Sequence, residues 1–259
     1  MLILLPPSEG KATPRRGARL DLARLSATEL TDAREQVVSA LVELCEADPD
    51  RAMQVLGLGP TQADDVRRNA DLRDAPTARA DATYTGVLYE SLDLASLDAA
   101  ARRRASRWIG IVSSVFGLVR PGDRIPSYRL AGGVNLPGVG AVPAHWRTVL
   151  DPTVREAAGS GLVVDLRSTT YAAFWRPGPD LARRTATVRV LQQVGDRRTV
   201  VSHFNKATKG RLVRALLESG ATPGTPARLA DAISDLGWKV ELGDPGKGGQ
   251  QLDVIVEEV

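Results

Sequence analysis

The sequence predicts an α/β protein with a mixed sheet, an α+β arrangement folded as a single compact domain over residues 1–259. Unbroken aliphatic runs at 2–6, 109–115 and 162–166 are typical of strands buried on both faces of a sheet. Amphipathic helical stretches lie between them, and no linker or internal repeat divides the chain. Hydrophobic residues make up 43% of the sequence, which is enough for one sizeable core.

The elements expected before residue 108 are mainly helical. Ser26 and Glu29 form a capping-box pattern that opens a helix reaching about Ala47. The other expectations are a Pro-, Gly- and Arg-rich loop over 8–24, a helical stretch over about 61–72, an irregular segment over 73–83, and a helix over about 97–107 capped by Ser96.

The elements expected after residue 116 begin with a long loop, because glycine and proline are dense over 117–143. Gly195-Asp196 is a hairpin signal. Asn205 is expected to cap a helix, and Thr225-Pro226 to open another. The remaining expected elements are a helical turn at 145–150, hairpin strands at 186–194 and 199–204, helices over 206–218 and from 226 to Gly237, and terminal strands at 238–242 and 252–257.

Composition excludes several classes of protein. The formal net charge is only +3, so the chain lacks the strongly basic balance of a nucleic-acid-binding arm. Cys45 is the single cysteine, which excludes an internal disulfide, and its amphipathic surroundings predict a buried, inert side chain. The apolar run at the N-terminus is too short for a signal peptide or a membrane span, which predicts a cytoplasmic protein with no membrane partner.

The first candidate site is the segment Pro-Pro-Ser-Glu-Gly-Lys at 6–11, directly after the first strand. Ligands of α/β sheets gather at the carboxyl ends of strands, so Lys11 is a candidate anion ligand. The segment is not a P-loop, because Leu5 replaces the first glycine and Ala12 replaces the Ser or Thr that binds magnesium. A polar loop without a ligand is the alternative.

The second candidate is the segment Ser-His-Phe-Asn-Lys-Ala-Thr-Lys-Gly-Arg at 202–211. Lysine is rare in the whole sequence, which has five lysines and 29 arginines. Two of the five, Lys206 and Lys209, nevertheless fall in the first turn of the helix expected after Asn205. Cations at that end oppose the helix dipole unless an anion binds there. We therefore expect Asn205, Lys206, Lys209 and Arg211 to contribute to an anion site; a tolerated basic first turn is the alternative.

Two weaker candidates follow other strands. Gly117 to Asp123 is a short apolar–Gly–apolar turn of the kind that presents backbone N–H groups to phosphate, flanked by Arg120 and Arg129. Asp165 and Arg167, after the strand at 162–166, either pair with each other or line the same pocket as Lys11 and Lys206. The two histidines lie far apart and give no metal-ligand spacing, so neither a metal nor a cofactor is expected.

Taken together, these segments resemble the YaaA-type peroxide-stress family, in the family's order and across nearly the whole chain. The resemblance rests on MLILLPPSEGK at the N-terminus, Tyr84-Thr85-Gly86, FGLVRPGDRIPSYRL at 116–130, LVVDLRSTTY and HFNKATKGRL. It implies a compact α/β fold with a basic cleft and a helix-hairpin-helix-like element, DNA binding, and a role in limiting free iron during oxidative stress. The hairpin falls on Gly117 to Pro121, the loop pair on Tyr128 and Arg129, and the basic helix start on Lys206, Lys209 and Gly210.

Two functions remain open. The first is a DNA-binding protein of the peroxide stress response that contacts phosphates through Lys206, Lys209, Arg120 and Arg129. The second is an enzyme acting on a nucleotide or another phosphorylated small molecule, with Glu9, Asp165 or His203 as proton carrier. An open basic trough favours the first function, whereas a pocket of a few hundred Å³ favours the second. A structural partner protein would show neither.

Overall fold

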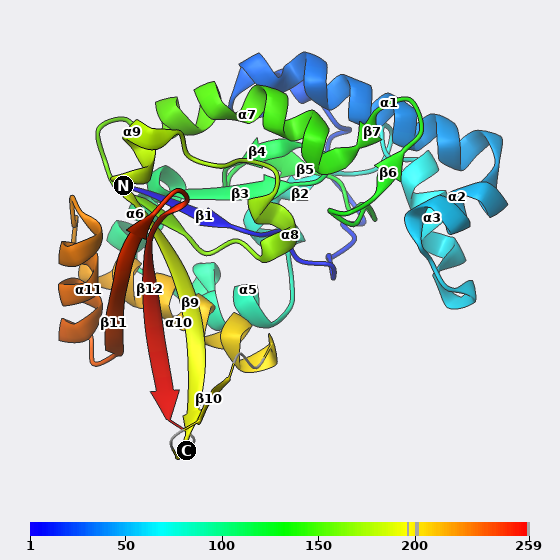
Figure 1. Cartoon of the computed structure of the whole chain (residues 1–259). Coiled ribbons are helices and arrows are strands. Elements are labelled where there is room, and N and C mark those ends of the chain that lie inside the picture. The colour runs from blue at the N-terminus through cyan, green and yellow to red at the C-terminus, as the bar shows by residue number, and fades with distance from the viewer. Residues whose placement is uncertain (196, 200–201, 258–259) are drawn as a thin grey trace.

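The computed structural model describes residues 1–195, 197–199 and 202–257, and its centre is a mixed sheet of eight strands. The strand order is β11-β12-β9-β8-β1-β3-β4, with β10 paired to β9 outside this path (Figure 1). The strands are β1 (Leu2–Leu5), β3 (Ile109–Ser113), β4 (Gly117–Val119), β8 (Val163–Asp165), β9 (Thr185–Val194), β10 (Arg197–Thr199), β11 (Lys239–Gly246) and β12 (Gly249–Glu257). Two small ladders pair β2 (Ala78–Arg79) with β5 (Arg124–Ile125) and β6 (Asn135–Leu136) with β7 (Gly140–Ala141).

The first strand lies in the interior of the sheet and is buried along its whole length. It pairs in parallel with β3 on one side and with β8 on the other, and β9 and β12 continue the parallel part beyond β8. The antiparallel strands β4 and β11 close the two edges. Because the chain leaves β1 towards β3 and returns to its other side as β8, the carboxyl end of β1 is a switch point, where α/β sheets bind ligands.

Helices cover both sides of this sheet. Figure 1 shows α7 and α1 above the β3–β4 end, and α10 and α11 around the lower part near β9 and β11; α6 contacts β1, β3 and α10. The helices are α1 (Thr31–Ala47), α2 (Pro49–Leu56), α3 (Ala63–Ala70), α4 (Ala80–Thr83), α5 (Val87–Leu92), α6 (Ala99–Trp108), α7 (Val142–Ala158), α8 (Thr169–Ala172), α9 (Pro179–Ala182), α10 (Ser202–Ser219) and α11 (Pro226–Asp235). The buried hydrophobic residues form one cluster that joins strands and helices.

The structure confirms the fold class and the three buried strands expected from aliphatic runs. The hairpin around Gly195 forms between β9 and β10; residues 202–204 belong to α10 rather than to the expected strand, and residues 200 and 201 lie outside the described residues. The terminal hairpin of β11 and β12 and the Thr225 cap are also present: the Thr225 hydroxyl accepts a hydrogen bond from the Arg228 N–H.

Several helix starts differ from the prediction. Ser26 is not an N-cap, because its N–H and hydroxyl both donate to Asp123, and α1 starts at Thr31. Asp98, not Ser96, caps α6 by accepting from the Ala101 N–H. Asn205 is not a cap either, since α10 already begins at Ser202. Lys206 therefore lies beyond the first turn, and the expected conflict with the helix dipole does not arise there.

A whole helix was missed where the sequence predicted only a turn at 145–150. Helix α7 spans 17 residues and places Pro143 at its start and Pro152 in its interior. The two prolines and the glycine-rich stretch before them conceal it in the sequence, because proline usually ends a helix pattern. Trp146 and Leu150, both wholly buried, hold this helix against the sheet.

Candidate functional site

The segment after β1 is clamped to the start of α5. The Tyr89 hydroxyl donates to the Pro6 carbonyl at 2.7 Å, and the Ser8 hydroxyl accepts from the Thr85 N–H at 3.0 Å. Lys11 forms a β-bridge with Tyr84. The loop over 6–11 is thus held at the carboxyl end of the central strand, which is where the sequence placed a candidate site.

Lys11 turns its amine inwards. The amine donates to the Ser8 carbonyl at 2.7 Å and lies 4.1 Å from the centre of the Tyr128 ring. Burial is the main reason that the pKa of Lys11 falls to about 7, and the neighbouring Arg129 lowers it further. Among the described residues, no carboxylate forms a salt bridge with Lys11. The uncharged form of the Lys11 amine is therefore accessible at neutral pH.

Arg129 lies beside this amine and is fixed through its backbone. The buried side chain of Asn69 accepts from the Arg129 N–H at 2.8 Å and donates to the Arg129 carbonyl at 2.7 Å. The Arg129 guanidinium is 3.4 Å from the exposed carboxylate of Glu9. A pair this long and this exposed is weak, so the guanidinium remains available to an anion.

The end of β8 carries a buried ion pair rather than a free acid. Arg167 donates to Asp165 through Nε at 2.9 Å and Nη2 at 2.7 Å, and also to the carbonyls of Tyr171 and Trp175. Burial alone raises the pKa of Asp165, but Arg167 and the nearby Lys209 hold it below its usual value. Asp165 and Arg167 therefore pair internally, and Arg167 also lines a cavity with Lys206, so part of the second alternative holds as well.

Lys209 is tied into the same region. Its amine donates to the Leu166 carbonyl at 3.0 Å, and burial lowers its pKa to about 8 while Asp165 opposes the shift. Lys206, one turn earlier on α10, is exposed. The Asn205 Oδ1 atom is buried and has no hydrogen-bond partner, which is an unfavourable state for a polar atom.

Three adjoining cavities, of ≈ 270, ≈ 340 and ≈ 380 Å³, join these groups along the carboxyl ends of β1 and β8. We call these three cavities together the trough. Each has the size of a small-molecule pocket, so the name does not mean the open basic surface expected for DNA binding. Ser168 lines all three. The first cavity contains Lys11 and Arg129, the second is walled mainly by apolar side chains with Lys206, and the third contains Asn205, Lys206 and Lys209. The second and third cavities share Lys206, and the first and second share Ser8, Glu9 and Tyr171.

Known proteins match this chain over its full length. A family model described as peroxide stress protein YaaA matches residues 1–242. The chain belongs to the YaaA peroxide stress protein family. A UPF0246 protein of Streptomyces coelicolor is 55% identical over 100% of both chains, and one of Corynebacterium efficiens is 43% identical over 99% of this chain and 100% of its own. Membership of the YaaA family supports a role in the response to peroxide stress.

The family resemblance implied a hairpin between two helices at Gly117 to Pro121, and the structure has a strand there. Gly117–Val119 form β4, which pairs with β3 before it, and β5 follows it. Gly117 adopts φ +66°, and a Cβ atom on it would lie 2.6 Å from the Trp146 ring. Its glycine therefore serves a tight turn and close packing.

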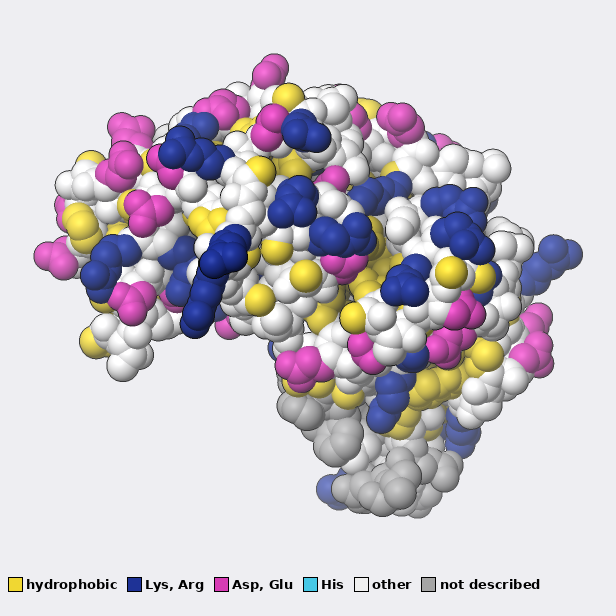
Figure 2. Space-filling view, turned by 180° about the vertical axis from the view of Figure 1, so that it is seen from behind, with side chains coloured by type: hydrophobic (Ala, Val, Ile, Leu, Met, Phe, Trp, Pro, Cys, Tyr) yellow, Lys and Arg dark blue, Asp and Glu magenta, His cyan; other side chains and the backbone are white. Residues whose placement is uncertain are grey.

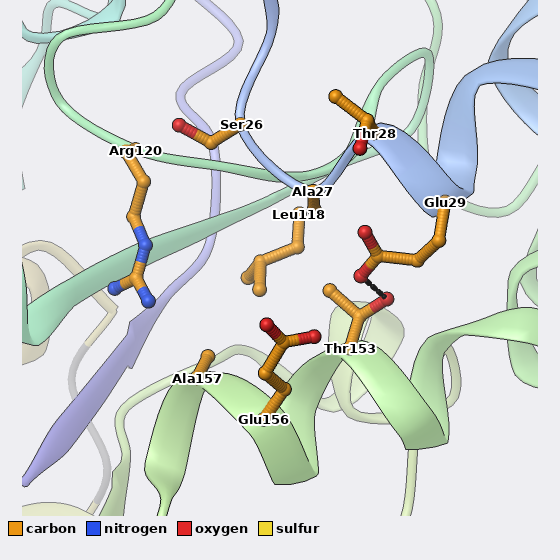
Figure 3. A pocket seen from close by; sticks show the side chains of 9 residues that line it. All are labelled: Ser26, Ala27, Thr28, Glu29, Leu118, Arg120, Thr153, Glu156 and Ala157. Carbon is orange, nitrogen blue, oxygen red and sulfur yellow. Dashed lines mark hydrogen bonds between the residues drawn. The ribbon is translucent and has the colours of Figure 1, made fainter.

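Arg120 lies apart from the trough. Because β4 runs antiparallel to β3, Arg120 lies near the amino end of β3, where it donates to the carbonyls of Arg107 and Ile109 at 3.1 and 3.0 Å. It lines a separate cavity of ≈ 380 Å³ between α7 and residues 26–29. In Figure 3 the carboxylates of Glu29 and Glu156 face the same cavity. Arg120 and Arg129 therefore do not flank one anion site.

The remaining candidates are placed as follows. Arg211 is exposed, donates to the Thr208 hydroxyl at 3.3 Å and lines none of the three cavities. The side chain of His203 lies outside the described part of the structure. Within the described residues, no group of three His, Cys, Asp or Glu side chains gathers as a metal site, and no helix is long and apolar enough to cross a membrane.

For three contributors to the trough, the sequence predicted no role. Ser168 and Tyr171 lie in the segment that follows Asp165, but only the charged residues there drew attention. Asn69, which fixes Arg129 from 60 residues away, has no local signal at all. A hydroxyl-rich run after a buried strand could have indicated Ser168 and Tyr171, because neutral donors at strand ends commonly bind ligands in α/β proteins.

Proposed function

We propose that this protein serves the peroxide stress response by binding a small phosphorylated ligand, of the nucleotide or sugar phosphate class, in the trough. The observation that carries the proposal is the convergence of Arg129, Lys206 and the Lys11 loop on adjoining cavities of a few hundred Å³ each. Cavities of this size suit a small molecule. The trough combines cations and hydroxyls with an apolar wall of Pro6, Val87 and Leu88.

The two cations have different chemical roles in this proposal. Arg129 offers a planar guanidinium that matches a phosphate with two parallel hydrogen bonds. Lys206 offers a mobile point charge at the boundary of the second and third cavities. The apolar wall between them suits the flat or hydrophobic body of the ligand, so one phosphorylated molecule can use all three surfaces.

Equilibrium titration with adenosine monophosphate, ribose 5-phosphate and inorganic phosphate tests the proposal. We expect Arg129→Met and Lys206→Met each to weaken binding about tenfold to a hundredfold, the scale of a lost charge-assisted hydrogen bond. Arg211→Met is the matched control, because Arg211 is an exposed cation on the same helix outside the cavities. Equal losses in all three variants, or no binding by the wild type, would refute the trough as the site.

A second candidate function is binding of DNA through its backbone. Its specific support is that Lys11, Arg129 and Lys206 are spread along joined cavities, which suits the successive phosphates of a strand. On the face seen in Figure 2, however, Lys and Arg side chains lie among Asp and Glu side chains. Gel shifts with single-stranded and duplex DNA, with adenosine monophosphate as competitor, separate the two candidates.

A further inference from the structure

Lys11 is the most unusual group of the trough, and the inference drawn from it rests on the proposed function. Lys11 is half-buried and its amine lies 4.1 Å from the centre of the Tyr128 ring, and its charged neighbours oppose one another: Arg129 and Arg68 disfavour a positive charge, and Glu9 and Asp65 favour it. With desolvation as the largest effect, the uncharged amine becomes accessible at neutral pH. A lysine kept only to hold a phosphate would need its charge instead.

The hydrogen bonds of Lys11 suit an uncharged amine. Such an amine has two N–H bonds and one lone pair. The Ser8 carbonyl lies 2.7 Å from the amine nitrogen and the Glu9 carbonyl 3.4 Å from it, so two backbone acceptors are available for the two hydrogens. The lone pair is then left without a proton, in a residue that lines the first cavity of the trough.

The same cavity holds groups that suit a carbonyl compound bearing a phosphate. Arg129 lines this cavity and can donate two parallel hydrogen bonds to the phosphate. The Tyr171 hydroxyl is kept protonated because burial raises the pKa of its phenol. Tyr171 and Ser168 line the cavity together with Lys11, so hydroxyl donors are at hand for a carbonyl oxygen. Nucleophile, proton donor and phosphate ligand thus line one cavity.

We propose that Lys11 forms an imine with the aldehyde group of a phosphorylated sugar bound in the trough. The amine lone pair attacks the aldehyde carbon, and the carbonyl π electrons move to the oxygen, which gains a proton from a hydroxyl donor. Loss of this oxygen as water forms the C=N bond. Both hydrogens of the water derive from the amine in the overall balance, so no oxidant or reductant is required. Desolvated lysines next to another cation are known nucleophiles of this kind.

An aldehyde sugar phosphate can reach the trough from two sources. One is a free sugar phosphate in its open-chain form. The other is a base-free sugar within a DNA strand, which carries the same aldehyde between two phosphates. The chemistry at Lys11 is identical in both cases, and the two sources differ only in what extends beyond the trough.

Reductive trapping tests the inference. The protein is incubated with ribose 5-phosphate or with an oligonucleotide containing one abasic site, treated with borohydride, and mapped by peptide mass spectrometry. We expect a stable adduct on the peptide that contains Lys11. An amine of pKa about 7 has roughly a thousandfold larger uncharged fraction at pH 7 than an ordinary lysine of pKa ~10.4. The Lys11 adduct should therefore form far faster than any adduct on a surface lysine, with a rate that levels off just above pH 7.

Two variants accompany this experiment. Lys11→Met keeps the length of the side chain and should abolish the adduct. Lys247→Met, in the exposed turn between β11 and β12, is the matched control and should leave it unchanged. The mapping of the wild-type protein decides the question even if Lys11→Met does not fold. Adducts mainly on Lys206, Lys209 or the N-terminal amine, or a rate that rises steadily to pH 10, would overturn the inference.

The outcomes separate this inference from the proposed function. Binding of adenosine monophosphate without any Lys11 adduct would overturn the inference and leave the proposed function standing. Absence of binding and of adduct would overturn both. A Lys11 adduct with ribose 5-phosphate alone identifies a free sugar phosphate as the ligand source, and an adduct with the abasic strand alone identifies DNA. Either adduct supports the inference.

Discussion

The surroundings of the Lys11 amine disfavour its charged form. Its burial makes the folded state bind its proton more weakly than the unfolded chain does, so the pKa drops from 10.5 to about 7 on folding. The Tyr128 ring, 4.1 Å from the amine, favours the charged form, but the loss of hydration is larger. Burial of the Lys11 amine thus lowers the stability of the fold, and it also makes the uncharged form accessible near neutral pH.

This shift predicts how stability depends on pH. Between pH 7 and 10.5 the unfolded chain holds the Lys11 proton and the folded chain does not, so the stability contributed by Lys11 rises with pH across this window. Below pH 7 both states are protonated and the full cost of burial remains. Denaturant unfolding of the wild type and of Lys11→Met at pH 6, 8 and 10 should show the wild type gaining on the variant as pH rises. Parallel pH profiles would contradict the assigned shift.

The burial of Cys45 predicts that its thiol does not react with peroxide in the folded protein. Its side chain is 2% exposed, and burial raises the pKa of its thiol to about 11. Peroxide oxidises thiolates, and almost none is present at pH 7. We expect the Cys45 peptide to stay unoxidised by mass spectrometry after hydrogen peroxide treatment of the folded protein. Denatured protein is the control and should be oxidised; rapid oxidation of the folded form would indicate a thiol sensor instead.

Single residues were the hardest level to predict. The sequence pointed to Lys11, Arg129 and Lys206, which the structure brings to one trough. It also pointed to Arg120, which lies at the other end of the sheet because β4 reverses the chain direction. Which arginine is free and which is paired depends on contacts far apart in sequence, and no local pattern contains that information.

At the level of elements, the packing of α10 against α5 predicts that a substitution of Gly210 changes the stability in the direction opposite to that usual for a helical glycine. Replacing a helical glycine with alanine normally stabilises a helix by up to ~1 kcal/mol. Here a Cβ atom would overlap the Leu88 carbonyl and lie 2.8 Å from the Ser91 Cβ atom. Gly210→Ala should therefore destabilise the protein by about 1–3 kcal/mol, the usual cost of overpacking, and should weaken ligand binding because Leu88 lines the trough.

The control for this variant is Gly224→Ala, since a Cβ atom there meets nothing within 4 Å. Denaturant midpoints of the two variants give the comparison. A Gly210→Ala protein as stable as the wild type would mean that α5 moves away from α10 at no cost.

Elements with a strong periodic pattern were predictable. Aliphatic runs gave β1, β3 and β8, and turn residues gave the two C-terminal hairpins. Helix starts failed where two signals competed: Asn205 looks like a cap, but α10 extends back to Ser202. The candidate site was predictable only as a region, because parallel strands bring their carboxyl ends to one edge whatever lies between them in sequence.

At the scale of the whole molecule, the trough contains few free charges, and this predicts a weak dependence of any DNA binding on salt. The uncharged form of Lys11 is accessible at neutral pH, and Lys209 is tied to the Leu166 carbonyl. Among the described residues, Arg129 and Lys206 remain as the cations of the trough that are available to an anion.

Each phosphate neutralised on a duplex contributes a slope of about −0.9 to log K against log salt, and about −0.7 on a single strand. Two contacts therefore predict a slope near −2 for a duplex, far shallower than that of a protein with six to ten contacts. Fluorescence anisotropy at 25–200 mM salt measures this slope. The double variant Arg129→Gln, Lys206→Gln should flatten the slope towards zero. The control Arg211→Gln should leave it unchanged. The slope could instead remain steep in the double variant, with no competition by adenosine monophosphate. DNA would then bind to a surface other than the trough.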